Sequence, residues 1–307
     1  MSSREPCYLE SHRSGILAAR ISEALERLRH CTLCPRSCEV NRLEGETGTC
    51  RTGRWARVAS LGPHFGEEAP LVGRGGSGTI FFSNCNLLCS FCQNYDISHG
   101  GEGREVSDLE LATMMLELQR LGCHNINLVT PSHVVPQILA ALSHAIEAGL
   151  RVPLVYNSSG YDSPAALDLL DGVVDIYMPD FKFWNEEPAR VTCGAPDYPE
   201  VARTALRAMH RQVGDLEMDA QGLAVRGLLV RHLVMPGDVA GTAQIMQFVS
   251  SEISANTYVN VMAQYRPCWQ AHTWAPIARR VSLEVYREAV RAAREAGLVR
   301  LDGPSGW

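Results

Sequence analysis

Apolar, β-branched segments alternate with helical patterns through most of this 307-residue chain. Between them, and after the last, apolar residues recur at helical spacing. The apolar segments span residues 78–83, 126–132, 152–158, 174–183, 227–235 and 257–265. Continuous apolar strands separated by helices are typical of a parallel sheet whose faces are covered. The alternation therefore predicts an α/β fold.

The number of strand–helix units narrows the fold further. Six units are too few to close an eight-stranded barrel, but they suit an open one. We predict a partial (β/α)6 TIM-type barrel over residues 78–307, ending in a helix. A doubly wound sheet is the alternative, because it shows the same alternation. In a parallel barrel, chemistry lies at the carboxyl ends of the strands, so the polar residues that follow them should converge on one rim.

The segment before the barrel has a different character. Residues 15–30 have a helical pattern, and a compact, cysteine-rich stretch follows. We predict a small helical, cysteine-rich metal-binding segment over residues 1–56 and a Gly-rich lead-in over 57–77. The Gly-rich run at 73–78 precedes a strand and has no lysine after it, which argues against a phosphate-binding loop.

Composition limits the partners. The net charge is -6 and no basic block stands out, so a nucleic acid is not expected. No apolar run approaches the length of a membrane span, and the first residues lack a signal pattern. We expect a cytoplasmic protein that does not contact a membrane. A reducing compartment disfavours disulfides between the eleven cysteines of the chain. Their clustering indicates metal binding.

Three cysteines follow the first barrel strand: Cys85, Cys89 and Cys92. Thiolates at such close spacing hold iron–sulfur clusters. A cubane [4Fe-4S] cluster has four irons, so three cysteines leave one iron open to bind something else. That is what a catalytic cluster requires. The alternative is a zinc knuckle or three buried thiols, although zinc usually takes four ligands.

Four further cysteines, Cys31, Cys34, Cys38 and Cys50, form a second group near the N-terminus. Four thiolates are a full set for zinc or for a second [4Fe-4S] cluster. Such a centre could be a structural staple for a segment too small to fold alone, or an auxiliary cluster. Pro35 after a ligand slightly favours the cluster. Four cysteines without metal are the remaining alternative.

The spacing Cys85-x3-Cys89-x-Phe91-Cys92 resembles the signature of the radical S-adenosylmethionine (SAM) superfamily. The resemblance implies that the open iron chelates the methionine part of SAM. One electron then cleaves SAM, and the 5′-deoxyadenosyl radical abstracts a hydrogen atom from the substrate. The family's GGE motif is absent, and "TPSH" at 130–133 stands in its place. The amino group of SAM would then be held by Thr130, Ser132 or backbone carbonyls.

The likeness extends to one group within the superfamily. The segments "YNSSGY", "VDIYMPDFKF" and "RHLVMPGD" follow the order of motifs in the pyruvate formate-lyase activating enzymes. The segments "HFGEEAP" and "VNVMAQYRP" resemble a little-characterised group related to those enzymes. Ala69 looks inserted into the E-E-P of that group. The resemblance covers nearly the whole chain, including the N-terminal cysteines.

Polar residues at the strand ends are candidates for binding SAM, which needs partners for hydroxyls, amides and charges. Arg231 and Lys182 are the expected partners of its carboxylate. The alternative for each candidate is a polar residue at a strand end that forms its hydrogen bonds within the protein and binds no ligand. The candidates are Gln93, Asn94, Asn127, Thr130, Ser132, Asn157, Ser159, Asp180, Lys182, Arg231 and His232.

Cys268, flanked by Tyr265 and Arg266, is the candidate to return a hydrogen atom to the product. Cys193 also lies on the predicted catalytic side, whereas Cys123 precedes a strand and belongs to the opposite face. A thiol without a role is the alternative for Cys268.

These motifs predict a radical SAM enzyme that acts on a small molecule, for example a carbohydrate or natural product, as an epimerase would. Its partners would be that substrate and a reducing electron donor such as flavodoxin or ferredoxin. One alternative is an activase that makes a glycyl radical in a partner protein. The other is a non-catalytic iron–sulfur protein for electron transfer.

Overall fold

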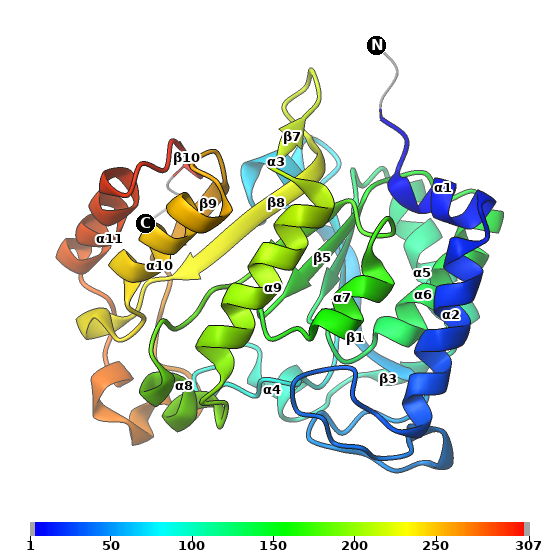
Figure 1. The fold of residues 1–307 in the computed structure, drawn as a ribbon, viewed down its shortest axis with the longest axis horizontal. Coiled ribbons are helices and arrows are strands. Elements are labelled where there is room, and N and C mark those ends of the chain that lie inside the picture. The colour runs from blue at the N-terminus through cyan, green and yellow to red at the C-terminus, as the bar shows by residue number, and fades with distance from the viewer. Residues whose placement is uncertain (1–3, 304–307) are drawn as a thin grey trace.

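The computed structural model describes residues 4–303, and its core is a mostly parallel sheet (Figure 1). The six predicted strands are all present and lie side by side in chain order. They are β2 Ser77–Phe82, β4 Ile126–Val129, β5 Leu154–Ser158, β6 Ile176–Pro179, β8 Ala224–Leu233 and β9 Tyr258–Met262. A doubly wound sheet would reverse the strand order in its middle. The unbroken order is that of a partial barrel.

Four shorter or outer strands extend this sheet. They are β1 Ala56–His64, β3 Arg104–Val106, β7 Glu217–Met218 and β10 Arg300–Leu301. Strand β1 runs antiparallel to β2, and β3 pairs with its first three residues. The predicted Gly-rich lead-in at 57–77 therefore contains a strand. Gly62 and Pro63 are untypical of a strand, so the sequence pattern does not predict one there. The proline is tolerated because that half of β1 lies at the edge of the sheet.

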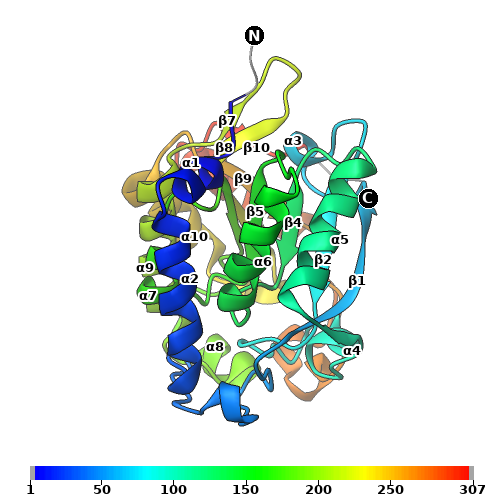
Figure 2. The same ribbon diagram turned by 90° about the vertical axis from the view of Figure 1, so that its right-hand side faces the viewer.

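Helices follow the parallel strands and cover the outer face of the sheet (Figure 2). They are α5 Asp108–Arg120, α6 Val135–Glu147, α7 Pro164–Leu170, α9 Tyr198–Val213, α10 Thr242–Phe248 and α11 Leu283–Glu295. Helix α6 is buried on nearly all sides. The reason is that α2, Ile16–Glu26, packs against its outer side, with α1, Cys7–Arg13, beside it.

Two short helices lie at the carboxyl ends of the strands. Helices α4, Tyr95–Ser98, and α8, Glu186–Cys193, lie there, and the four-cysteine segment (blue in Figure 1) lies at the same end. Helix α3, Ala69–Val72, lies at the opposite end. No helix within residues 4–303 is both long and apolar enough to cross a membrane.

Candidate active site

A cavity of about 440 Å³ lies where the carboxyl ends of the parallel strands meet. Its volume is in the range of sites that hold a small molecule or cofactor. Eleven of the predicted site residues line it: Cys85, Cys89, Cys92, Gln93, Asn94, Thr130, Asn157, Ser159, Asp180, Lys182 and Arg231. The parallel topology thus brings together residues that span about 150 positions of sequence, as the barrel rule predicts.

The loop from Cys85 to Cys92 follows β2 and opens into this cavity. The backbone is left-handed at Asn84 (φ 68°), just before the loop, and at Leu88 (φ 55°) within it. Asparagine tolerates this conformation, but for leucine it is costly. The Leu87 N–H donates to the Cys85 sulfur at 3.3 Å. Burial raises the pKa of Cys85 to about 12. The cysteine is therefore a thiol unless a metal displaces its proton, as a cluster does.

Neighbouring side chains support the other two cysteines of the loop. The hydroxyl of Ser98 lies 3.2 Å from the Cys92 sulfur. The thiol of Cys193, at the end of α8, lies 3.4 Å from the Cys89 sulfur. Hydrogen bonds to cluster sulfurs are one of the factors that set a cluster's reduction potential. The residues present therefore fit a cluster held by Cys85, Cys89 and Cys92.

Asp180 joins two cations in the wall of the cavity. The Lys182 Nζ lies 2.5 Å from one of its carboxylate oxygens, and the Arg231 Nε lies 2.9 Å from the other. Burial alone would raise the pKa of Asp180, but Arg231 and Lys182 outweigh it and hold the pKa at about 2. The same ion pairing raises the pKa of Lys182 despite burial. Asp180 and Lys182 are therefore both charged at neutral pH. The two cations, Lys182 and Arg231, suit the carboxylate of a zwitterionic ligand.

Three carboxylates that were not predicted as site residues line the cavity: Glu67, Glu68 and Asp302. Glu67 Oε2 lies 3.7 Å from the Arg231 Nη1. Glu68 accepts a hydrogen bond of 2.8 Å from Asn260 Nδ2, and its second oxygen is buried without a partner among residues 4–303. These carboxylates are acceptors that an ammonium group of a ligand could use. The sequence feature that could have identified Glu67 and Glu68 is the "EEAP" motif. In the sequence analysis this motif served only to show the likeness to a family.

Glu67 should make stability depend on pH. Burial raises its pKa to about 7 from 4.5, with Arg231 opposing the rise and Glu68 adding to it. The folded chain therefore binds more protons than the unfolded chain between these values. The contribution of Glu67 is fully present below pH 4.5 and is lost as the pH rises through 7. We expect Glu67→Gln to be more stable above pH 7 by up to about 3 kcal/mol.

Urea denaturation at pH 5 and pH 8 measures this difference. Glu26→Gln, at an exposed position of α2, is the matched control and should leave the pH dependence unchanged. An equal pH dependence in Glu67→Gln and the parent protein would rule out Glu67 as its source.

Four predicted residues lie away from the cavity: Asn127, Ser132, His232 and Tyr265. His232 is fully buried in β8, with its ring nitrogens at 2.7 Å from the Phe181 carbonyl and 2.9 Å from the Thr242 hydroxyl. Such a histidine is satisfied within the core. The sequence could not separate it from Arg231, because adjacent residues of a strand point to opposite faces.

Cys268 and Arg266 line a different hollow. It has a volume of about 430 Å³ and is also lined by His272, Arg279 and Arg280. The segment that carries Cys268 is nevertheless close to the cluster loop, because the Gln270 N–H donates to the Ser90 carbonyl at 3.0 Å. The structure therefore places the candidate hydrogen donor beside the loop but outside the main cavity.

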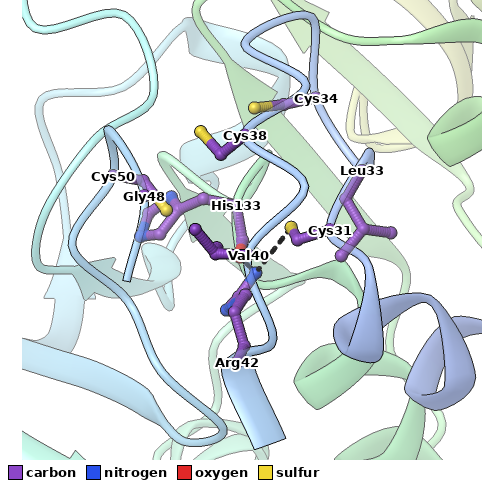
Figure 3. Close-up of a pocket in the computed structure, with 9 residues that line it drawn as sticks. All are labelled: Cys31, Leu33, Cys34, Cys38, Val40, Arg42, Gly48, Cys50 and His133. Atoms are coloured by element: carbon purple, nitrogen blue, oxygen red, sulfur yellow. Dashed lines mark hydrogen bonds between the residues drawn. The ribbon is translucent and has the colours of Figure 1, made fainter. Parts of the chain in front are cut away.

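The four N-terminal cysteines line one small cavity, which Figure 3 shows. Arg42 and His133 line it with them. Arg42 is only 1% exposed, and its Nη1 lies 3.8 Å from the Cys31 sulfur. The fold thus brings the four cysteines, which are spread over 20 positions of the sequence, around one cavity.

Within residues 4–303, no three side chains of histidine, cysteine, aspartate or glutamate lie close enough together to hold a single metal ion. This observation applies to a site for a single metal ion such as zinc and does not test a site for a cluster of several irons. Zinc holds its thiolates at about 2.3 Å from one point. The cysteines of a four-iron cluster bind different irons and stand farther apart.

Comparisons with known proteins agree with this site. The Radical SAM superfamily matches residues 79–238 of the chain. An uncharacterized protein of Methanocaldococcus jannaschii is 31% identical over 297 residues, which cover 94% of this chain and 82% of that protein. A radical SAM methyltransferase from Sphaerobacter thermophilus has a similar structure, with a TM-score of 0.51 and 15% identity. That match covers 73% of this chain and 65% of the methyltransferase, and it concerns the fold.

The matched region contains the three-cysteine loop and most of the residues that line the main cavity. Superfamily membership implies SAM and a [4Fe-4S] cluster as cofactors. The cavity, its thiols and its buried charges suit both. The chain therefore belongs to the Radical SAM superfamily.

Proposed function

We propose that this protein cleaves SAM reductively and abstracts a hydrogen atom from a small-molecule substrate. One observation carries the proposal: the three-cysteine loop and the Asp180, Lys182 and Arg231 ion group face the same cavity. The cluster would supply the electron that cleaves SAM. The cavity would hold SAM beside it and exclude water from the reaction.

The charges of the cavity suggest how SAM is held. Cys85, Cys89 and Cys92 would bind the cluster. Lys182 or Arg231 would pair with the carboxylate of SAM, whereas Thr130, at the end of β4, would meet its amino group. Thr130 has a left-handed backbone (φ 62°), an unfavourable conformation for a β-branched residue. Such strain is often found at functional sites.

Gln93, Asn94, Asn157 and Ser159 supply amides and a hydroxyl that would suit the ribose and adenine. Glu67 and Glu68 are further acceptors on the inner side of the cavity. Together with Thr130 they would bind the amino group of SAM in place of the missing GGE motif, or they would bind the substrate.

A contact between the segment around Trp269 and the cluster loop supports a small substrate. Trp269 stacks on Tyr95 of α4, with ring centroids 6.4 Å apart, and contacts His99. A site that this segment covers would favour a metabolite, such as a carbohydrate or natural product, over a peptide loop. An epimerase with Cys268 as hydrogen donor is one such enzyme, and it would require the segment around Cys268 to move toward the cavity. The activase related to pyruvate formate-lyase activating enzymes, acting on a glycine of a partner protein, remains the second candidate.

The hollow around Arg266, Arg279 and Arg280 would suit an acidic electron donor. Opposite charges on two protein surfaces speed their association. A flavodoxin or ferredoxin docked there would lie beside the segment that contacts the cluster loop. We also propose that the four N-terminal cysteines bind metal, either as a second [4Fe-4S] cluster or as zinc.

Formation of 5′-deoxyadenosine tests the proposed function. Anaerobically reconstituted protein is mixed with dithionite and SAM, and the product is followed by mass spectrometry. We expect the parent protein to form 5′-deoxyadenosine and Cys89→Ala to form none, because the cluster would lose a ligand. Cys123→Ala removes a buried thiol from the opposite end of the barrel and should keep the activity.

The same preparation separates the alternatives. A full cluster that neither cleaves nor binds SAM would contradict the proposal and favour the electron-transfer protein. Binding of SAM without its cleavage would indicate an enzyme that cleaves SAM only when its substrate is bound. Iron, sulfide and zinc counts identify the N-terminal metal: about eight irons for two clusters, or about four irons with one zinc.

A further inference from the structure

We propose that the four-cysteine segment is a metal centre that positions the radical SAM cluster loop, and that Arg36 connects the two. The inference rests on the proposed cluster at Cys85, Cys89 and Cys92. It adds a role for the N-terminal metal and a positioning residue for the reaction. Arg36 lies between Cys34 and Cys38, so any metal held by these two cysteines restrains its backbone.

A buried cation supports a negatively charged centre in the four-cysteine cavity. Arg42 donates to the Gly53 and His133 carbonyls at 3.1 and 3.0 Å, which leaves its Nη2 buried without a hydrogen-bond partner within residues 4–303. None of the carboxylates in the described chain forms an ion pair with it. A buried charge without a counter-charge is strongly unfavourable. Four thiolates around a metal carry the negative charge that Arg42 requires, both in a cluster and in a zinc site.

The guanidinium of Arg36 makes four hydrogen bonds, all to backbone carbonyls outside its own segment. Two go to the cluster loop: Nε to the Asn86 carbonyl at 2.8 Å and Nη2 to the Leu87 carbonyl at 3.1 Å. The other two go to the end of α8: Nη2 to Cys193 at 2.7 Å and Nη1 to Gly194 at 2.6 Å. One side chain thus ties the four-cysteine segment, the cluster loop and α8 together.

This connection reaches the cluster ligands themselves. Asn86 and Leu87 lie between Cys85 and Cys89, and the thiol of Cys193 lies 3.4 Å from the Cys89 sulfur. A shift of Arg36 would therefore change the path of the loop and the contact to Cys89. A second connection runs through His133, whose carbonyl accepts from Arg42 and whose Nε2 lies 2.9 Å from the Ser83 carbonyl, two residues before Cys85.

The segment needs a metal to hold this shape. Between Cys31 and Cys50 its only helical turn is Arg42–Glu44, and the backbone is left-handed at Ser37 (φ 41°) and Glu39 (φ 60°). Both strained residues lie within or next to the span that carries Arg36. Metal ligation commonly supplies the folding free energy of segments of this kind. Without it, Arg36 would lose its fixed position.

Two variants of the full-length protein and their combination test the connection. Cys34→Ser should lose the N-terminal metal, whereas Arg36→Ala should keep it. Both should weaken SAM binding about tenfold to a hundredfold, because hydrogen bonds that position the cluster loop are lost. The readout is the change that SAM causes in the EPR spectrum of the reduced protein, which reports the cluster with an open iron. Metal content is counted in each sample.

The double variant Cys34→Ser with Arg36→Ala should bind SAM no more weakly than either single variant, because both act through one connection. Arg36→Lys, which keeps the charge and some of the hydrogen bonds, should lose less than Arg36→Ala. Arg29→Ala removes an exposed arginine of the same region and is the control. It should change neither metal content nor SAM binding.

Several results would overturn the inference. A parent protein with about four irons and no zinc would exclude the metal centre, because the three-cysteine cluster accounts for all of that metal. Loss of that metal with unchanged SAM binding would exclude the coupling, and so would unchanged SAM binding in Arg36→Ala. Additive effects in the double variant would exclude Arg36 as the connection. A parent protein that never binds SAM would contradict the proposed function instead, and the iron content and EPR line shape of the three-cysteine cluster would then test the coupling alone.

Discussion

Asp180→Ala should lower the free energy of unfolding by about 3–5 kcal/mol, the usual effect of removing one partner from a buried ion group. Asp180 holds Lys182 at 2.5 Å and Arg231 at 2.9 Å, and both cations are largely buried. Without Asp180 the two positive charges lie close together in a largely buried site. Glu67, at 3.7 Å from Arg231, can compensate only in part. The variant should also bind SAM poorly, since Lys182 and Arg231 would lose their orientation.

Urea denaturation at pH 7 measures the loss of stability, and SAM-induced changes in the EPR spectrum measure binding. Asp180→Asn keeps the shape and one acceptor, so its effect should be smaller. Glu26→Ala breaks an exposed ion pair with Arg29 and should change stability by less than about 1 kcal/mol. A loss for Asp180→Ala as small as that of Glu26→Ala would show that the ion group does not stabilise the fold.

Phe91→Ala is the second change with a large expected effect. Phe91 is 5% exposed and lies edge-on to Phe183, with ring centroids 5.8 Å apart. Removing a buried aromatic side chain costs about 3–5 kcal/mol, because the cavity it leaves closes only in part. Phe91 also immediately precedes Cys92, so the loop should bind its cluster less firmly. We expect both a lower midpoint of denaturation and less iron after reconstitution.

Phe65 offers a matched control, because the same side chain is 63% exposed there. Phe65→Ala should leave both stability and iron content close to those of the parent protein. If Phe91→Ala were as stable as Phe65→Ala, the aromatic residue of the motif would not anchor the loop through packing.

The structure separates residues that look equivalent in the sequence. Arg231 and His232 are adjacent candidates, yet Arg231 faces the cavity and His232 is buried between a carbonyl and a hydroxyl. Which face of a strand points into a barrel depends on the register with its neighbours. No local pattern in β8 reveals that register, because the strand is apolar on both sides.

The opposite case is Arg36, whose importance the sequence does not reveal. In the sequence it is one of many arginines, and the cysteines beside it are already explained as metal ligands. Its four acceptors are backbone carbonyls at positions 86, 87, 193 and 194. Backbone carbonyls leave no signature in a sequence, so only the folded chain shows that they meet at one guanidinium.

The sequence by itself determined the parallel α/β fold, the three-cysteine loop and the superfamily. It did so because apolar periodicity and close cysteine spacing are local features whose physical meaning does not depend on distant residues. Only the tertiary structure decided that Glu67 and Glu68 line the cavity, that Cys193 contacts Cys89, and that Cys268 faces another hollow. These are contacts between segments far apart in the chain, and they depend on strand register and loop path. Both are set by packing over the whole barrel.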